Sequence, residues 1–258
     1  MCNILILLTC FCLVASIKQS KHNRQTVSIY LQHINNNTML NRLLDIFAPE
    51  YCIECGDEGS IWCEFCRLQH SSIPSRCFMC HKQTSDYQTC KSCYKKTGLK
   101  SVYIYGEYKD FNKMLIKALK FDCKRHACLP IANSMSEILP FYKEMPVLVP
   151  IPTSPLRVRQ RGFDHTQAIT KTLAKKSQLT CSKLLIRTND LRQVGSVRKD
   201  RLSQINGSFR LRNNKPLPKH VLLVDDVVTT GATLSEASKV LKQARVKRVE
   251  AIVFTYSK

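Results

Sequence analysis

Residues 221–233 read Val-Leu-Leu-Val-Asp-Asp-Val-Val-Thr-Thr-Gly-Ala-Thr. The four consecutive apolar residues at 221–224 are typical of a central strand that is covered on both faces. Two acids and a loop of small and hydroxyl-bearing residues follow, at the strand end where open α/β sheets place their ligands. The stretch therefore predicts an α/β fold and marks the position of a binding site.

The residues after the apolar run favour a phosphate and sugar ligand. Neighbouring buried carboxylates are costly without a cation or hydrogen-bond donors, and ribose hydroxyls are suitable donors. A flexible glycine just before a helix lets backbone N–H groups and the positive helix end point at a phosphate. A simpler interpretation is a helix capped by Thr233 after a buried strand with two turn aspartates, but the complete order favours a ligand site. The expected binding residues are Asp225, Asp226, Thr229, Thr230, Gly231, Ala232 and Thr233.

Cysteines form a second pattern, because most of the 14 cluster before the α/β part. The pairs are Cys52/Cys55, Cys63/Cys66, Cys77/Cys80 and Cys90/Cys93. Each two-residue gap lets both thiolates bind one metal, so the count predicts two Cys₄ zinc sites. Spacing leaves sequential and interleaved grouping open, and the sequential one is simpler. A closed all-thiolate site indicates structural zinc rather than catalysis, and nothing nearby resembles a redox thioredoxin unit.

The hydrophobic pattern predicts the remaining elements. We expect strands at 102–105, 147–152, 221–224 and 248–255, and helices at 110–121, 129–139, 165–176 and 234–243. Strands that alternate with helices indicate a mostly parallel sheet. Residues 52–93 contain too little apolar material for their own core, with Trp62, Phe65 and Phe78 as its minimal candidates, so metal must stabilise them. Cys123, Cys128 and Cys181 are expected to be small buried residues.

Length and charge limit the class of protein. A chain of 258 residues with 44% hydrophobic residues can build one main domain with a small appendage. The net charge of +21 predicts attraction to polyanions, which include nucleic acid, polyphosphate substrates and anionic membranes. A solvated basic surface without such a role gives the same charge. Clustered cysteines that suit a metal favour a reducing compartment, so we expect a cytoplasmic protein.

Residues 1–38 form a separate segment. The apolar run at 4–15 has the length of a signal-peptide core, but no Lys or Arg precedes it and no cleavage site is clear. The run is also too short to span a bilayer, which takes about 20 residues, so no stable membrane insertion is expected. We interpret 1–38 as a disordered extension or as sequence upstream of a start at Met39, with a signal or anchor as the alternative. An amphipathic helix is predicted after Met39.

Further motifs accompany these two patterns. They are Tyr105-Gly-Glu-Tyr-Lys, Leu115-Ile-Lys-Ala-Leu-Lys-Phe121, Val149-Pro-Ile-Pro, Arg157-x-Arg-Gln-Arg-Gly-Phe163, and Gln193-x-Gly with Arg198, Arg201, Asn206 and Phe209. Together the motifs resemble the ComF family of competence proteins over nearly all of the chain from Met39 onward. Most members read Arg-Gly-Phe-Asn-Gln where this chain has Asp164 and His165 after Phe163.

The resemblance implies a type I phosphoribosyltransferase-like domain at 99–258 behind a double zinc ribbon at 39–98. By that resemblance Asp225 and Asp226 contact the ribose hydroxyls of phosphoribosyl pyrophosphate, and 229–233 hold its 5-phosphate. Magnesium would bind mainly through the ligand's pyrophosphate and ribose oxygens. The segment 150–161, with Arg157 and Arg161, becomes the pyrophosphate-side loop, and guanidinium matches phosphate geometry. Residues 187–201 are implied to be a closing hood or a surface linker.

The resemblance also sets the functional expectations. The first is transfer or sensing of the phosphoribosyl group, in nucleotide metabolism linked to DNA uptake during natural transformation. The alternative is a non-catalytic competence factor that handles single-stranded DNA, with DNA-uptake or recombination proteins as partners. No convincing general base is present, since Asp164 and His165 are candidates by position only and a structural histidine is the competing interpretation.

Overall fold

The computed structural model describes residues 50–70, 73–122, 124–188, 207–212 and 216–257. The chain divides into residues 1–50 and 51–258, and the account below concerns the second unit. The expected boundaries at 38/39 and 98/99 stay predictions. The helix predicted after Met39, and most of the expected hood, lie outside the described residues.

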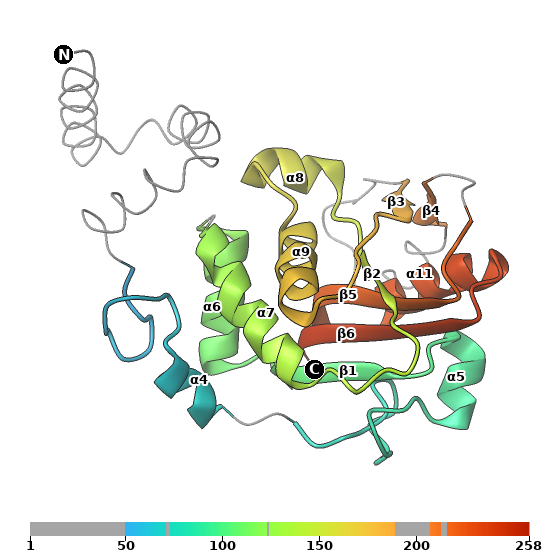
Figure 1. Ribbon diagram of the computed structural model, residues 1–258, viewed down its shortest axis with the longest axis horizontal. Coiled ribbons are helices and arrows are strands. Elements are labelled where there is room, and N and C mark those ends of the chain that lie inside the picture. Colours follow the sequence, from blue (N-terminus) through green and yellow to red (C-terminus); the bar gives the residue numbers. More distant parts are fainter. Residues whose placement is uncertain (1–49, 71–72, 123, 189–206, 213–215, 258) are drawn as a thin grey trace. The chain divides into compact units, whose positions relative to one another are not determined.

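A four-stranded parallel sheet forms the centre of this unit (Figure 1). Its strands are β1 (Val102–Glu107), β2 (Val147–Pro150), β5 (His220–Val228) and β6 (Arg248–Tyr256), and their order is β1-β6-β5-β2. Each neighbouring pair is parallel. The mostly parallel α/β sheet predicted from the alternating pattern is confirmed. All four carboxyl ends therefore meet at one edge, where β5 lies between β6 and β2.

Helices cover both faces of the sheet. Those of the α/β part are α6 (Asp110–Lys120), α7 (Cys128–Glu137), α8 (Pro155–Arg161), α9 (His165–Ser177) and α11 (Ala232–Gln243). Shorter elements are α4 (Glu64–Gln69), α5 (Lys91–Thr97), a 3₁₀ turn at Arg125–Ala127, and the antiparallel pair β3 (Leu185–Arg187) and β4 (Phe209–Leu211). The predicted helices are thus present with ends shifted by a few residues.

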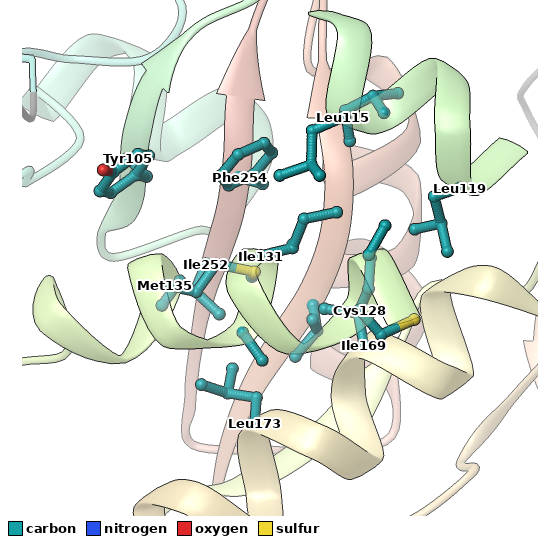
Figure 2. Close-up of a cluster of buried hydrophobic side chains, with 14 of the residues drawn as sticks. Tyr105, Leu115, Leu119, Cys128, Ile131, Met135, Ile169, Leu173, Ile252 and Phe254 are labelled. Atoms are coloured by element: carbon teal, nitrogen blue, oxygen red, sulfur yellow. The ribbon is translucent and has the colours of Figure 1, made fainter. Parts of the chain in front are cut away.

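The two-residue period of the strands sorts the core into two layers. Leu222 and Val224 of β5 pack with one cluster, and Leu223 packs with the other. Figure 2 shows side chains of α6, α7 and α9 meeting over Ile252 and Phe254 of β6 in the first cluster. Because Asp226 continues the register of Leu222 and Val224, its side chain belongs to the face that α6, α7 and α9 cover.

Two parts of the site differ from the predicted elements. Strand β5 does not end at Val224 but continues to Val228, because β6 pairs with it as far as Tyr256, so both acids lie within the strand. The segment expected to be a loop with Arg157 and Arg161 contains helix α8 instead. The Ser154 side chain caps that helix and Pro155 occupies its first turn, a position where a missing N–H costs nothing.

The cysteine-rich residues share the core of the α/β part. Trp62 is buried and its ring centroid lies 4.7 Å from that of Phe111 in α6. Phe78 is buried in the other layer, whereas Phe65 is 70% exposed, so its assignment to the core was wrong. Of the three cysteines expected to be buried outside the pairs, Cys128 is buried and Cys181 is exposed, so the prediction for Cys181 was wrong. Cys123 lies outside the described residues. In the described part of the chain, no helix combines the length and apolar character required to cross a bilayer.

Candidate functional site

The two acids lie side by side near the carboxyl end of β5. The backbone N–H of Asp226 donates a 2.9 Å hydrogen bond to Oδ1 of Asp225. The Asp226 side chain is buried, and Asp225 is half-buried. Neighbouring strand residues point to opposite faces, so the two carboxylates have different surroundings.

Lys120 and His165 bring two helices to Asp226. The Lys120 ammonium, at the last residue of α6, forms an ion pair with Asp226 Oδ2. His165 Nε2, at the first residue of α9, lies 3.4 Å from the same oxygen. All three side chains are largely buried. The carboxylate therefore joins α6, α9 and β5 at one point.

These surroundings separate the pKa values of the two acids. Burial and the neighbouring charge of Asp226 raise the pKa of Asp225 well above its ordinary value. Burial also opposes ionisation of Asp226, but the Lys120 charge and the contact with His165 outweigh it and hold its pKa far below the ordinary range. Without a ligand, Asp226 therefore ionises more readily than Asp225.

Arg161 is tied to the same cluster through His165. An N–H of its guanidinium donates to His165 Nδ1 over 3.0 Å, since arginine has no acceptor. In the neutral ring the proton then lies on Nε2, the nitrogen that faces Asp226. The Arg161 guanidinium also lies 5.7 Å from the ring centroid of Phe121. The cation is thus held beside the acids by the side chains around it.

Asp164 has a structural role. Its Oδ1 accepts a 3.1 Å hydrogen bond from the backbone N–H of Gln167 and a 3.0 Å hydrogen bond from the Thr153 hydroxyl. Asp164 therefore caps α9 and fixes the loop after β2. Arg157 lies in the first half of α8, where its backbone N–H donates to Ser154 Oγ over 3.4 Å.

The loop from β5 to α11 turns at a glycine just before the helix begins. Helix α11 begins at Ala232 after Gly231, which has a φ of +73° and makes no side-chain cap. Thr230 Oγ1 accepts the N–H of Ala232 at 3.4 Å. Thr233 lies within the helix, so the cap in the simpler interpretation is wrong. The first turn of α11 keeps its N-terminal N–H groups at the same sheet edge as the acids.

The eight paired cysteines gather into two tetrads. The first tetrad is Cys52, Cys55, Cys63 and Cys66, and the second tetrad is Cys77, Cys80, Cys90 and Cys93. Within each tetrad all sulfur atoms lie within 4.8 Å of one another, and the Cys55–Cys63 and Cys80–Cys90 sulfur pairs are each 3.6 Å apart. A tetrahedral zinc with Zn–S bonds of about 2.3 Å requires sulfur separations of about 3.8 Å. Both tetrads could therefore hold a metal ion, and their all-thiolate donor sets are consistent with zinc.

Sequence reasoning gave Lys120 no role, and it left His165 between a candidate base and a structural histidine. Lys120 lay in one of the recognised motifs, and the structure places it at the last residue of α6. His165 was considered only by its position, and the structure shows that it contacts Asp226. The contacts of Lys120 and His165 with Asp226 join residues that are far apart in the chain. The only sequence signal that could have pointed to Lys120 is the motif that contains it.

Comparisons with known proteins agree with the fold. Residues 125–258 match the phosphoribosyl transferase domain family. Competence protein F of Haemophilus influenzae is 27% identical over 216 residues, which cover 77% of this chain and 93% of the relative. Competence protein ComFC of Streptococcus pneumoniae is 29% identical, covering 75% and 87%, and ComFC of Bacillus subtilis is 29% identical, covering 69% and 77%. By the family match over residues 125–258, the chain belongs to the phosphoribosyl transferase domain family.

Proposed function

We propose that this chain binds phosphoribosyl pyrophosphate with magnesium at the carboxyl end of β5 and transfers the phosphoribosyl group. Asp225 and Asp226 would contact the ribose hydroxyls, and residues 229–233 would hold the 5-phosphate. Arg157 and Arg161 would face the pyrophosphate. Magnesium, bound together with the ligand, would neutralise part of the diphosphate charge.

The placement of two neighbouring acids at the carboxyl end of β5, with Lys120 and His165 against Asp226, carries this proposal. Two neighbouring acids, one buried and one half-buried, are expensive to ionise together, and among the described residues the Lys120 ammonium forms an ion pair with one of them. Such pairs are characteristic of functional sites. Ribose hydroxyls would donate hydrogen bonds to the Asp225 carboxylate, and a bound cation would favour the ionisation of that residue. Only Val227 and Val228 separate the acids from residues 229–233, so both groups lie near the same end of β5.

The chain's own residues would act mainly by position and charge. As pyrophosphate leaves ribose C1, positive charge develops on the sugar, and a carboxylate at the hydroxyl edge stabilises it. The phosphate loop fixes the other end of the sugar, so the reacting carbon keeps its alignment. Arg161 lies close to the acids because of its contact with His165, and it can neutralise negative charge on the leaving group.

Calorimetric titration of the full chain with phosphoribosyl pyrophosphate and magnesium tests the proposal. We expect binding by the parent protein and at least about tenfold weaker binding by Asp225→Asn, since a hydrogen bond to a charged group contributes about 1.5–3 kcal/mol. Asp86→Asn is the matched control, because it removes an exposed acid from a turn with a φ of +49° that asparagine tolerates. Absence of binding by the parent, or equal binding by Asp225→Asn, would refute the assignment.

A role in DNA uptake is the second candidate. It is supported by the names of the relatives, which are competence proteins, and by the net charge of +21. We propose that the basic surface engages single-stranded DNA in the cytoplasm, alongside DNA-uptake or recombination proteins, either with or without phosphoribosyl transfer. Affinity for a single-stranded oligonucleotide should fall steeply as salt concentration rises. Absence of binding at low salt would remove this candidate.

A further inference from the structure

Phe78 links the second tetrad to the phosphate loop. The residue follows Cys77 directly and lies between that ligand and Cys80. Its side chain is only 2% exposed, and it packs in the sheet layer that includes Val228 and Leu234. These two residues flank the loop, so an aromatic ring from the cysteine-rich part forms part of the loop's support.

The contact between this ring and Gly231 is close. A Cβ atom added to Gly231 would overlap Cε2 of Phe78 and lie 2.9 Å from Cδ2, a separation that real Cβ atoms essentially never show. Gly231 also has a φ of +73°, which favours glycine independently. The glycine therefore meets two requirements, one from its own backbone and one from the ring that lies against it.

Other contacts hold the second tetrad's surroundings on the same sheet edge. His81 Nε2 and the Tyr256 hydroxyl share a 2.9 Å hydrogen bond, and Tyr256 pairs with Val228 at the end of β5. Helix α5, which carries Cys93, packs against α11, and a Cβ on Gly98 would lie 3.2 Å from Ser238 Oγ. The second tetrad is thus attached to both the start and the middle of α11.

The first tetrad has different neighbours. Cys52 and Cys66 pack in the opposite layer with Trp62 and Phe111. The layers lie on opposite faces of the sheet. The first tetrad can therefore serve as an internal control for changes made in the second one. Only the second one contacts the phosphate loop through a ring placed between its ligands.

We propose that Phe78 positions the phosphate loop and that metal at the second tetrad sets the position of Phe78. The identity of the ligand in this inference rests on the proposed function. The coupling between the second tetrad, Phe78 and the loop at 229–233 does not depend on that function. The turn is closed by hydrogen bonds from the Cys77 N–H to Lys82 O (2.8 Å) and from the His81 N–H to Cys77 O (2.9 Å). Metal on Cys77 and Cys80 fixes this turn, and the turn presses the ring under Gly231. Metal occupancy and phosphate affinity are then linked reciprocally.

Titration of side-chain variants with phosphoribosyl pyrophosphate and magnesium measures the effect on the ligand. We expect Phe78→Ala to weaken binding about tenfold, the usual scale for a residue that supports a binding group. Phe78→Leu, which keeps most of the volume, should restore affinity to within about threefold of the parent. Gly231→Ala should also weaken binding, because its Cβ overlaps the Phe78 ring. Phe78→Ala removes that overlap, so it should reduce affinity less in the Gly231→Ala background than in the parent.

Hydrogen exchange of the amides at 230–234 tests the coupling without any ligand. We expect Cys80→Ser to reduce their protection, while Cys55→Ser, the equivalent change in the first tetrad, leaves it at the parent level. Equal protection in both variants, or Phe78→Ala with parental affinity and parental exchange, would overturn the inference. If the parent bound no phosphoribosyl pyrophosphate, the proposed function would fail, and the exchange comparison would still decide this coupling.

Discussion

The ammonium group of Lys120 forms an ion pair with the buried carboxylate of Asp226, and so joins the end of α6 to β5. This contact supplies the positive charge that the two neighbouring acids need. It also places a cation within the proposed ribose site. Its strength can be measured, because both side chains are largely buried and therefore weakly screened.

Replacing Lys120 with methionine keeps most of the side-chain length and removes the charge. We expect Lys120→Met to lower the free energy of unfolding by about 3 kcal/mol at neutral pH, since it leaves a buried carboxylate unpaired. The double variant Lys120→Met/Asp226→Asn should recover part of that loss, because no charge then remains buried. Urea denaturation of the parent, Lys120→Met, Asp226→Asn and the double variant measures these free energies of unfolding. If the losses of the two single variants simply added in the double variant, the ion pair would be contradicted.

The neighbouring acids should respond to pH with opposite signs. The pKa of Asp225 is raised in the folded state, so its ionisation lowers the stability of the fold as pH rises through that pKa. We therefore expect Asp225→Asn to gain thermal stability over the parent as pH increases, on the order of 3 °C for about 1 kcal/mol.

The pKa of Asp226 is lowered in the folded state, so its contribution is fully present above the ordinary pKa and is lost only as pH falls through the folded one. Asp226→Asn should therefore be less stable than the parent across the neutral range. Melting curves from pH 5 to pH 9 measure both variants. A shift of the same sign in both would contradict the separated pKa values.

A second buried acid, Glu250, lies near the opposite end of the sheet. It is fully buried, with His220 Nε2 2.8 Å from one oxygen and the Arg248 guanidinium 2.9 Å from the other. Burial opposes ionisation, but His220 and Arg248 outweigh it and lower the pKa of Glu250.

We expect Glu250→Gln to reduce the free energy of unfolding by about 2 kcal/mol at pH 7, the scale of hydrogen bonds to a charged group. Because the pKa is lowered, the deficit should shrink as pH falls below the ordinary glutamate value, and denaturant titration at pH 7 and pH 4 checks this. Affinity for phosphoribosyl pyrophosphate should stay unchanged, since the residue lies far along the strands from Asp225 and Asp226.

Trp62 reports on the first tetrad. It is the single tryptophan of the chain, it precedes Cys63, and it is buried against Phe111. Loss of metal from the first tetrad should release this ring into water and shift its fluorescence emission to the red. Chelator titration followed by emission measures the effect. Cys55→Ser should reproduce the shift and Cys80→Ser should not, and the reverse order would contradict the assignment of Trp62 to the first tetrad.

Sequence reasoning succeeded where the signal is local. The strand, the acid pair and the phosphate loop are consecutive at 221–233, and each cysteine pair spans only four residues. Such patterns follow directly from periodicity, turn chemistry and ligand spacing. It failed on the end of β5 and on the start of α8, because pairing with β6 and the cap from Ser154 decide them.

By itself, the sequence determined the parallel α/β pattern, the four cysteine pairs, and the order of acids and small residues that suits a sugar phosphate. Only the tertiary structure decided that Lys120 and His165 contact Asp226, that Arg161 contacts His165, and that the Phe78 ring lies against Gly231. The physical reason is that a carboxylate's charge state and a loop's support depend on side chains that folding brings from other helices and from the second tetrad. No periodicity along the chain encodes those contacts.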